Sequence, residues 1–361
     1  MGMRVSGWIG LLLVAAPIMA GDWDPGLAAN YLDARQKAWF EWPRAKATGG
    51  PCISCHTNAP YLLARPVLRR VLGESQPTAY ETGLLNALRA RVESTDAKDM
   101  FPSAAKEPAA SQGRGVEGVL AALFLSLADD GSKPDSDAQK AFDRLWSLQL
   151  KEGPSKGAWP WFSRGLDPYE MPHSAFCGAA LAAVAVAQTS ADYRNRSDVR
   201  AHLDDLKAYL LRERESQPLH NQLFLVWASA RLPDLLPPAA RQKTINEVLS
   251  RQNTDGGWTI QSLGPWQEHA GAPPSAQSNS YATALVSYTL AVGGVPRSSA
   301  GLAKAIQWLE SHQDRQTGYW AADSMNKRYP SGSMEEGFMR DTATAFASMA
   351  LADATSQGKL K

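Results

Sequence analysis

The sequence predicts an all-α fold in which pairs of helices repeat along the chain, and three observations predict it. From about residue 106 onward, apolar stretches rich in small residues alternate with amphipathic stretches. A helix that is apolar on all sides lies in an interior, whereas an amphipathic helix covers that interior. Three of the amphipathic stretches end in a Gln that is followed by a Gly-containing loop and a Trp. The residues before 106 also have helical spacing, interrupted by one Gly/Pro turn.

The alternation predicts five apolar helices and their amphipathic partners. We expect the apolar helices over residues 115–129, 174–187, 219–230, 280–291 and 340–353, and the amphipathic ones over 138–149, 198–213, 240–252 and 300–313. Because a single pair cannot bury its apolar face alone, each pair must stack on its neighbours. Residues 106–361 are therefore expected to form one repeat domain of five or six helix pairs.

The Gln and Trp positions carry a resemblance to a known group. They are Gln149 with Trp159, Gln252 with Trp258, and Gln313 with Trp320. This pattern resembles the QW repeats of the squalene-hopene cyclase and prenyltransferase group. The resemblance implies an α/α toroid over residues 106–361, in which Gln and Trp tie the end of an outer helix to the next turn of the ring. It is specific for fold and not for chemistry.

Residues 22–105 are expected to form a smaller helical unit ahead of the toroid. An aromatic-rich helix is expected over residues 31–40, a second helix up to Gly73 and a third over 82–91. A Gly/Pro turn separates the first two helices and contains a CxxCH motif at residues 52–56. The polar stretch 94–115 is then expected to be a connector or a covering loop.

The CxxCH motif is typical of covalent haem attachment. The thiols of Cys52 and Cys55 would add to the haem vinyl groups, and the imidazole of His56 would be the proximal ligand of the iron. A zinc knuckle needs about four ligands and a thioredoxin-type dithiol needs a βαβ unit, and the sequence has neither around this motif. The sequence therefore predicts one covalent haem c and resembles an exported c-type cytochrome fused to the toroid.

The distal ligand of that iron stays open between three alternatives. Met100 would give a His/Met iron, His173 would give a His/His iron, and an open position would suit catalysis or gas binding. The third cysteine, Cys177, lies in an apolar stretch and is expected to be a packed, inert thiol.

The first residues resemble a secretory signal. Arg4 precedes an apolar run over residues 8–16, and small residues near Ala20 offer a cleavage site. We expect a cleaved signal over residues 1–21, a periplasmic or secreted chain, and no later membrane-spanning segment. The formal net charge is +1 and Lys and Arg are scattered, which excludes a nucleic-acid-binding footprint.

Cyclase chemistry is not expected, although the fold resemblance suggests it. Triterpene cyclases of the group use a D-x-D-D-T-A motif whose central acid protonates an alkene. Here Asp341 matches the end of that motif, but Phe338 and Arg340 stand where the first Asp and the proton donor would be. A cation cannot act as that acid. Asp341 is expected instead to cap the helix that follows it.

The expected function is periplasmic electron transfer or redox chemistry, with the toroid as a docking surface or an apolar-ligand scaffold. A haem enzyme acting on a lipid-like substrate, a haem-based sensor and, last, a triterpene cyclase are the alternatives. The expected partners are a redox protein and an apolar small molecule held in the toroid. Its cavity would be lined by aromatic residues at helix starts and loops, namely Trp159, Trp161, Trp266 and Tyr281.

Overall fold

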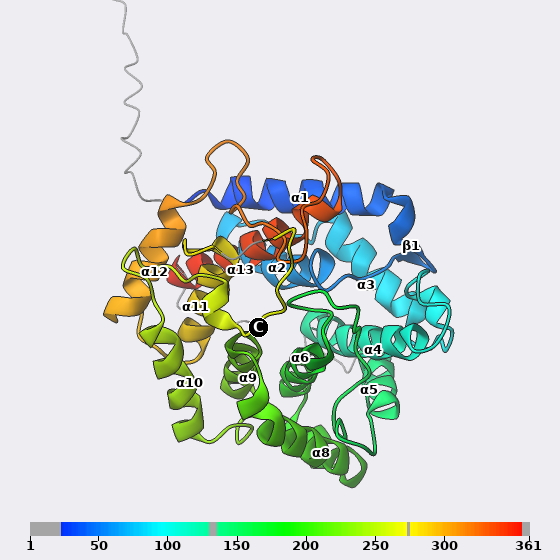
Figure 1. Ribbon diagram of the computed structural model, residues 1–361. Coiled ribbons are helices and arrows are strands. Elements are labelled where there is room, and N and C mark those ends of the chain that lie inside the picture. Colours follow the sequence, from blue (N-terminus) through cyan, green and yellow to red (C-terminus); the bar gives the residue numbers. More distant parts are fainter. Residues whose placement is uncertain (1–22, 130–135, 273–274, 356–361) are drawn as a thin grey trace, which may run out of the picture.

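The computed structural model of the chain describes residues 23–129, 136–272 and 275–355. Within these residues, six outer and six inner helices alternate along the chain and form a ring (Figure 1). The outer helices are α1 (Pro25–Glu41), α3 (Ala79–Arg91), α5 (Ser136–Leu148), α8 (Ser197–Glu213), α10 (Pro238–Ser250) and α12 (Ala300–Ser311). The inner helices are α2 (Asn58–Leu72), α4 (Ala109–Ala128), α6 (Ala175–Ala187), α9 (Leu219–Arg231), α11 (Ser280–Val292) and α13 (Phe338–Thr355).

Shorter elements lie in the connections. The described part of the chain has one further α-helix, α7 (Ala191–Asn195), and one antiparallel pair of two-residue strands, β1 (Lys46–Ala47) and β2 (Gly50–Pro51). Single 3₁₀ turns are η1 (Pro43–Ala45), η2 (Ala97–Asp99), η3 (Pro172–Ser174), η4 (Arg214–Ser216), η5 (Gln261–Leu263) and η6 (Glu335–Gly337). The fold is thus mostly helical, as the sequence predicts.

Neighbouring inner helices pack side by side around the ring. Helix α13 lies between α2 and α11, α9 lies between α11 and α6, and α6 packs on α4. Helix α3 contacts both α2 and α4, so it joins the two ends of this series. The ring therefore contains helices from both ends of the chain.

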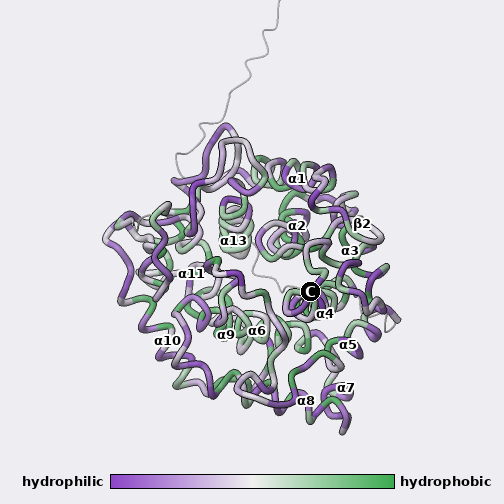
Figure 2. Tube along the Cα trace, turned by 45° about the vertical axis from the view of Figure 1, so that its right-hand side comes forward, coloured by the Kyte–Doolittle hydropathy of each residue, from purple (hydrophilic) through white to green (hydrophobic). Residues whose placement is uncertain are grey.

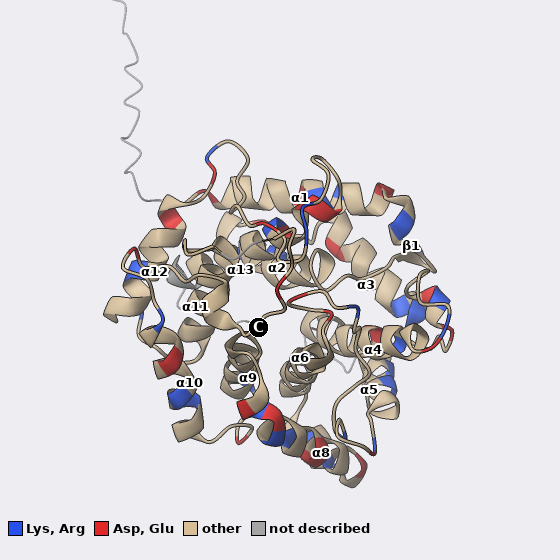
Figure 3. Cartoon of the chain, in the orientation of Figure 1, with Lys and Arg blue, Asp and Glu red and all other residues tan. Residues whose placement is uncertain are grey.

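The division into inner and outer helices follows from composition. Helix α6 consists of apolar and small residues, and almost all of it is buried, whereas α8 buries only one face, including Val199, Leu203 and Leu206. Helices α8 and α10 contain charged and polar residues, while α6 and α11 contain almost no charged ones (Figures 2 and 3). An apolar helix inside an amphipathic layer is the arrangement that the periodicity predicts.

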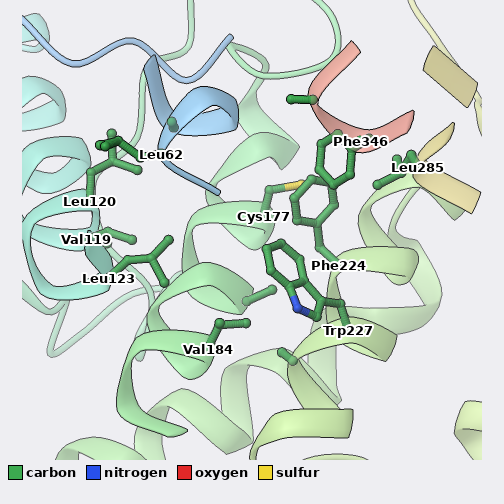
Figure 4. Close-up of a cluster of buried hydrophobic side chains, with 14 of the residues drawn as sticks. Leu62, Val119, Leu120, Leu123, Cys177, Val184, Phe224, Trp227, Leu285 and Phe346 are labelled. Atoms are coloured by element: carbon green, nitrogen blue, oxygen red, sulfur yellow. The ribbon is translucent and has the colours of Figure 1, made fainter. Parts of the chain in front are cut away.

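The interior of the ring is a packed hydrophobic core, not an open channel. Figure 4 shows that its side chains come from each of the six described inner helices. They include Leu62 of α2, Leu120 of α4, Cys177 of α6, Phe224 and Trp227 of α9, Leu285 of α11 and Phe346 of α13. All seven are buried.

The three Gln/Trp loops have one common geometry. In each, the indole N–H donates to a backbone carbonyl near the end of the preceding outer helix, and the Gln amide donates both to the loop and to a backbone carbonyl in the N-terminal part of the neighbouring outer helix of the ring. The indole bonds run from Trp159 to Leu145, from Trp258 to Val248 and from Trp320 to Leu309, each at 2.7–2.8 Å. The carbonyls of the neighbouring helices belong to His202, Gly301 and Asp24. This is the tie between outer helices that the pattern predicts.

The N-terminal helices differ from their predicted bounds for local reasons. Helix α1 begins at Pro25, because Asp24 Oδ1 caps Leu27 N–H at 2.9 Å and a Pro fits the first helical turn. Helix α3 begins at Ala79 behind a capping box formed by Thr78 and Glu81. In both cases the capping residues precede the aromatic and apolar residues from which the helix was predicted, so the helix begins earlier than expected.

The segment before residue 106 is built into the ring. Helix α2 packs against α1 and α13, and α1 also contacts α13. The ring of the described residues therefore includes helices from before residue 106 as well as from after it. The domain limit near residue 105 stays a prediction. No helix in the described residues is long and apolar enough to cross a membrane. The signal expected over residues 1–21 lies outside the described residues.

All connections from an outer helix to the next inner helix leave at the same end of the ring. Three of them, residues 149–174, 251–279 and 312–337, are long and adjoin one another over that end, which we call the mouth (Figure 1). The return connections 73–78, 232–237 and 293–299 are short. Because long loops on a rigid scaffold commonly carry binding and catalytic residues, the mouth is the candidate location of a functional site.

Candidate active site at the mouth of the toroid

A cavity of about 1070 Å³ opens between two of the mouth loops, 251–279 and 312–337. Its walls carry an indole, a phenol, three carboxylates and two cationic side chains. These are Trp266, Tyr329, Glu268, Asp323, Glu336, Lys327 and Arg328. A cavity of this size holds a ligand of several rings and offers it both aromatic faces and hydrogen-bonding groups.

Asp167 joins the third mouth loop to the two that form the cavity. Its backbone N–H donates to Oδ1 of Asn326 at 2.9 Å, and its carbonyl accepts from Nδ2 of the same side chain at 2.8 Å. Its carboxylate Oδ2 accepts from the backbone N–H of Gln267 at 2.9 Å. The Asp167 side chain is fully buried. One residue thus holds the positions of all three loops.

The other carboxylate oxygen of Asp167 has no hydrogen-bond partner among the described residues. The closest basic atom is Nε2 of His173 at 3.8 Å, and this nitrogen and Nε2 of His269 are also buried without a hydrogen bond. Burial raises the pKa of Asp167 and lowers the pKa of His173, because a buried charge loses its hydration. Burial therefore disfavours charge on both groups behind the wall of the cavity.

The indole of Trp266 is held firmly against the ring. Its N–H donates to the carbonyl of Ile260 at 2.7 Å, and its ring meets the buried imidazole of His220 edge-on, with centroids 5.4 Å apart. This Trp is the predicted cavity aromatic that does line the cavity. Tyr281 is fully buried, and Trp159 and Trp161 are buried in the loop 149–174, so these three lie in the core.

The CxxCH segment lies inside the packed structure. Cys52 is buried, Cys55 is partly so, and the buried surroundings raise the pKa of Cys52 to about 12. The imidazole of His56 stacks on the ring of Phe338 with centroids 3.7 Å apart, and burial lowers the pKa of His56 to about 3. Covalent haem at Cys52 and Cys55, with His56 as proximal ligand, stays a prediction.

The two candidate distal ligands have other contacts. Met100 is fully buried, and its sulfur lies 3.6 Å from a guanidinium nitrogen of Arg144. His173 lies at the mouth beside Asp167. No three His, Cys, Asp or Glu side chains of the described residues are grouped so that they could hold a metal ion. The roles proposed for Met100 and His173 stay predictions as well.

Asp341 is not a helix cap. It lies inside α13, is fully buried, and accepts hydrogen bonds from Tyr31, Arg35 and Thr57 at 2.7–3.0 Å. The Arg35 guanidinium binds both of its oxygens. The sequence suggested a cap because Asp341 stands near the start of an apolar stretch, but α13 begins three residues earlier and Asp341 points into a packed interface.

Sequence reasoning missed most of the cavity. Asp167, Gln267, Glu268, His269 and Asp323 lie in irregular loops, where neither helical period nor motif spacing marks them. The usable signal was loop length, because the mouth loops are much longer than the return connections and contain Trp, Tyr and Pro residues.

Comparison with known proteins shows which solved structures share this fold. No family model and no curated protein sequence matches the chain. Among solved structures, it is similar to a glycosyl hydrolase family 88 protein from Bacteroides vulgatus, with 12% identity, a TM-score of 0.56, and 92% of this chain and 98% of that chain covered. A polysaccharide lyase gives 13% identity, a TM-score of 0.53 and coverages of 92% and 97%. A UGL variant described with dGlcA-Glc-Rha-Glc has 14% identity and a TM-score of 0.51, with 90% of this chain and 94% of that chain covered.

These likenesses correct the expected identity. The similar structures are glycosyl hydrolase and polysaccharide lyase proteins, and not cytochromes fused to a cyclase-type toroid. At most a tenth of this chain is left unmatched, so the greater part of residues 22–105 belongs to the shared fold. The prediction of haem-based electron transfer or redox chemistry was therefore wrong, and so was its alternative, a haem enzyme acting on a lipid-like substrate. Triterpene cyclisation, which the sequence already made the last alternative, is not supported either. At these identities the comparisons show the fold alone, which is a helical toroid.

Proposed function

We propose that this chain is a carbohydrate-processing enzyme that binds a saccharide in the mouth cavity and cleaves it there. The observation that carries the proposal is the cavity itself: aromatic faces and carboxylates line one space of about 1070 Å³ at the mouth. Sugar rings stack their C–H faces on aromatic rings and use their hydroxyls in hydrogen bonds, so such a lining suits them. The activities named for the similar toroids support the same class of substrate.

We assign the cleavage to Glu268 and Asp323. They are exposed in the cavity and come from its two different loops, so a sugar lying between the loops would meet both. Glycoside cleavage commonly uses two carboxyl groups on opposite sides of the scissile bond. Glu336 differs from them, because its Oε2 already accepts from the backbone N–H of Gly332 and lies 3.3 Å from the Arg340 guanidinium. We therefore assign Glu336 a structural role, in which it holds the loop 312–337 in place.

Cleavage and binding by the purified full chain test this proposal. Neutral and uronate-containing polysaccharides are supplied separately, and new reducing ends and ultraviolet absorbance of unsaturated products are recorded. Glu268→Gln and Asp323→Asn should each lower kcat by about 100-fold or more, and Trp266→Ala should weaken calorimetric binding. Asp204→Asn, at an exposed carboxylate of α8, is the matched control and should behave as the wild type. Wild-type protein that neither binds nor cleaves any of these saccharides contradicts the proposal.

The finer expectations from the sequence do not enter this proposal. A haem-bearing segment over residues 22–105, an apolar molecule in the toroid and a redox partner protein remain untested predictions. The saccharide proposal depends on the mouth loops and does not require any of them.

A further inference from the structure

Asp167 is hydrogen-bonded to chain positions beside both of the carboxyl groups to which we assign cleavage. Its Oδ2 accepts from the backbone N–H of Gln267, the residue directly before Glu268, at 2.9 Å. Its backbone N–H and carbonyl bind the two polar atoms of the Asn326 side chain at 2.9 and 2.8 Å. Asn326 follows Asp323 by three residues. The saccharide proposal itself gives Asp167 no part in the reaction.

A short turn connects Asn326 to Asp323. The hydroxyl of Ser324, the residue directly after Asp323, accepts from the backbone N–H of Asn326 at 3.2 Å. A serine hydroxyl that accepts from the N–H two residues further along holds the backbone between them in a turn. The position of Asp323 is therefore set by Asn326, and through Asn326 by Asp167.

The loop that carries Asp167 is itself held in place by buried side chains. The indole N–H of Trp161 donates to the carbonyl of Tyr169 at 2.9 Å, and the hydroxyl of Ser174 donates to the carbonyl of Pro168 at 2.9 Å. Both donors belong to buried residues, and the side chain of Asp167 is fully buried. Asp167 therefore offers the other two mouth loops a fixed point of attachment.

The separation between two cleaving carboxyl groups controls glycoside cleavage. At about 5–5.5 Å one group can attack the sugar directly, whereas about 6.5–9.5 Å leaves room for a water molecule. A misplacement of about 1 Å can lower the rate about 100-fold. Glu268 and Asp323 come from different loops, so a contact within one loop cannot fix their separation. A residue that binds both loops can fix it.

We propose that Asp167 is the positioning residue of the mouth site, which sets the separation between Glu268 and Asp323. This rests on the proposed function. Asp167 acts through Gln267 on one side and through Asn326 on the other, and it exchanges no proton with the saccharide. The site therefore needs a hydrogen-bond acceptor at residue 167 and does not need its negative charge.

Single substitutions at residue 167 of the full chain are the first test. Asp167→Leu removes the acceptor of the Gln267 N–H and should lower kcat by about 10- to 100-fold, with KM changed by less than about twofold. Asp167→Asn keeps an oxygen that accepts from this N–H, so its kcat should stay within about threefold of the wild type. Ser163→Ala, at an exposed position in the same loop, is the matched control and should behave as the wild type. An Asp167→Asn variant as inactive as Asp167→Leu overturns the proposal, because the negative charge would then be what the site needs.

Double variants are the second test, and they separate positioning from a general effect on the fold. Asp167→Leu leaves the backbone contacts to Asn326 in place, so it acts through Glu268. In the Glu268→Gln background it should therefore lower kcat by less than about twofold further, because residues that act as a unit are not additive. Independent effects would multiply instead. Asn326→Ala tests the other side in the same way, alone and combined with Asp323→Asn, and circular dichroism verifies that each variant is folded.

The outcomes separate this proposal from the proposed function. A wild-type kcat in Asp167→Leu or in Asn326→Ala, while Glu268→Gln and Asp323→Asn are impaired, overturns the positioning role and leaves saccharide cleavage standing. Losses that multiply in the double variants also overturn it. If Asp167→Leu does not fold, the Asn326→Ala variants decide alone. Wild-type protein that neither binds nor cleaves any saccharide overturns the cleavage proposal and, with it, the role of Asp167.

Discussion

Nε2 of Gln313 donates a hydrogen bond to the backbone carbonyl of Asp24 across 2.9 Å, and the backbone N–H of Asp24 donates back to Oε1 of Gln313 across 2.6 Å. Residues 289 positions apart thus exchange two hydrogen bonds. In the other two Gln/Trp loops, the same amide contacts the next outer helix along the chain. Here that helix is α1, so the last loop closes the ring onto its first helix.

Loss of this closure should cost measurable stability. Gln313→Ala removes the partners of two part-buried backbone groups of Asp24, and we expect the free energy of unfolding to fall by about 1–3 kcal/mol. Urea unfolding followed by circular dichroism measures it. Gln316→Ala, at an exposed position in the same loop, should change the free energy by less than about 0.5 kcal/mol. Equal effects of the two variants would show that the closure does not stabilise the ring.

The Asp341 carboxylate should matter more than a helix cap does. Asp341→Asn leaves the Arg35 guanidinium facing a neutral amide in a buried site, and removal of one partner of a buried ion pair costs about 3–5 kcal/mol. A capping residue would cost about 1 kcal/mol. Denaturant unfolding of Asp341→Asn, Arg35→Gln and the double variant measures the coupling. If Asp341→Asn lowers the free energy of unfolding by less than about 1 kcal/mol, the carboxylate contributes no more than a helix cap would.

The Gln/Trp ties could be predicted from the sequence because both partners lie in one short loop at a repeated spacing. The contacts of Asp341 could not, since Arg35 lies 306 residues away and reaches it only when the ring closes. The same holds for the hydrogen bond between the hydroxyls of Tyr169 and Tyr281, which are 112 residues apart. The surroundings of the CxxCH motif could not be predicted either, since they come from distant parts of the sequence. His56 packs on Phe338, which comes from the other end of the chain.

The hydrogen bonds by which Asp167 joins the mouth loops should depend on the shape of its side chain more than on its negative charge. In Asp167→Asn the amide oxygen can still accept from the Gln267 N–H, so we expect the free energy of unfolding to stay within about 1 kcal/mol of the wild type. Asp167→Leu leaves that N–H unpaired and should lose about 1–3 kcal/mol. Hydrogen exchange of the Gln267 amide should then become faster in Asp167→Leu and remain slow in Asp167→Asn. Fast exchange in both variants would mean that the negative charge itself holds the loop.

His220 should make the fold sensitive to acid. Its pKa is about 4 in the folded chain because of burial, against an ordinary value near 6.5, so the unfolded chain binds a proton that the folded chain refuses. The free energy of unfolding is therefore unaffected by His220 above about pH 6.5, and it falls as the pH decreases from 6.5 toward 4. The total loss is about 3 kcal/mol at roughly 1.4 kcal/mol per pH unit. Urea unfolding at a series of pH values from 7 to 4 should show this slope in the wild type and a shallower one in His220→Gln. Because His56 is also buried, with a pKa lowered to about 3, some acid sensitivity should remain in that variant. A slope in His220→Gln as steep as in the wild type would show that His220 is not a buried imidazole held neutral by the fold.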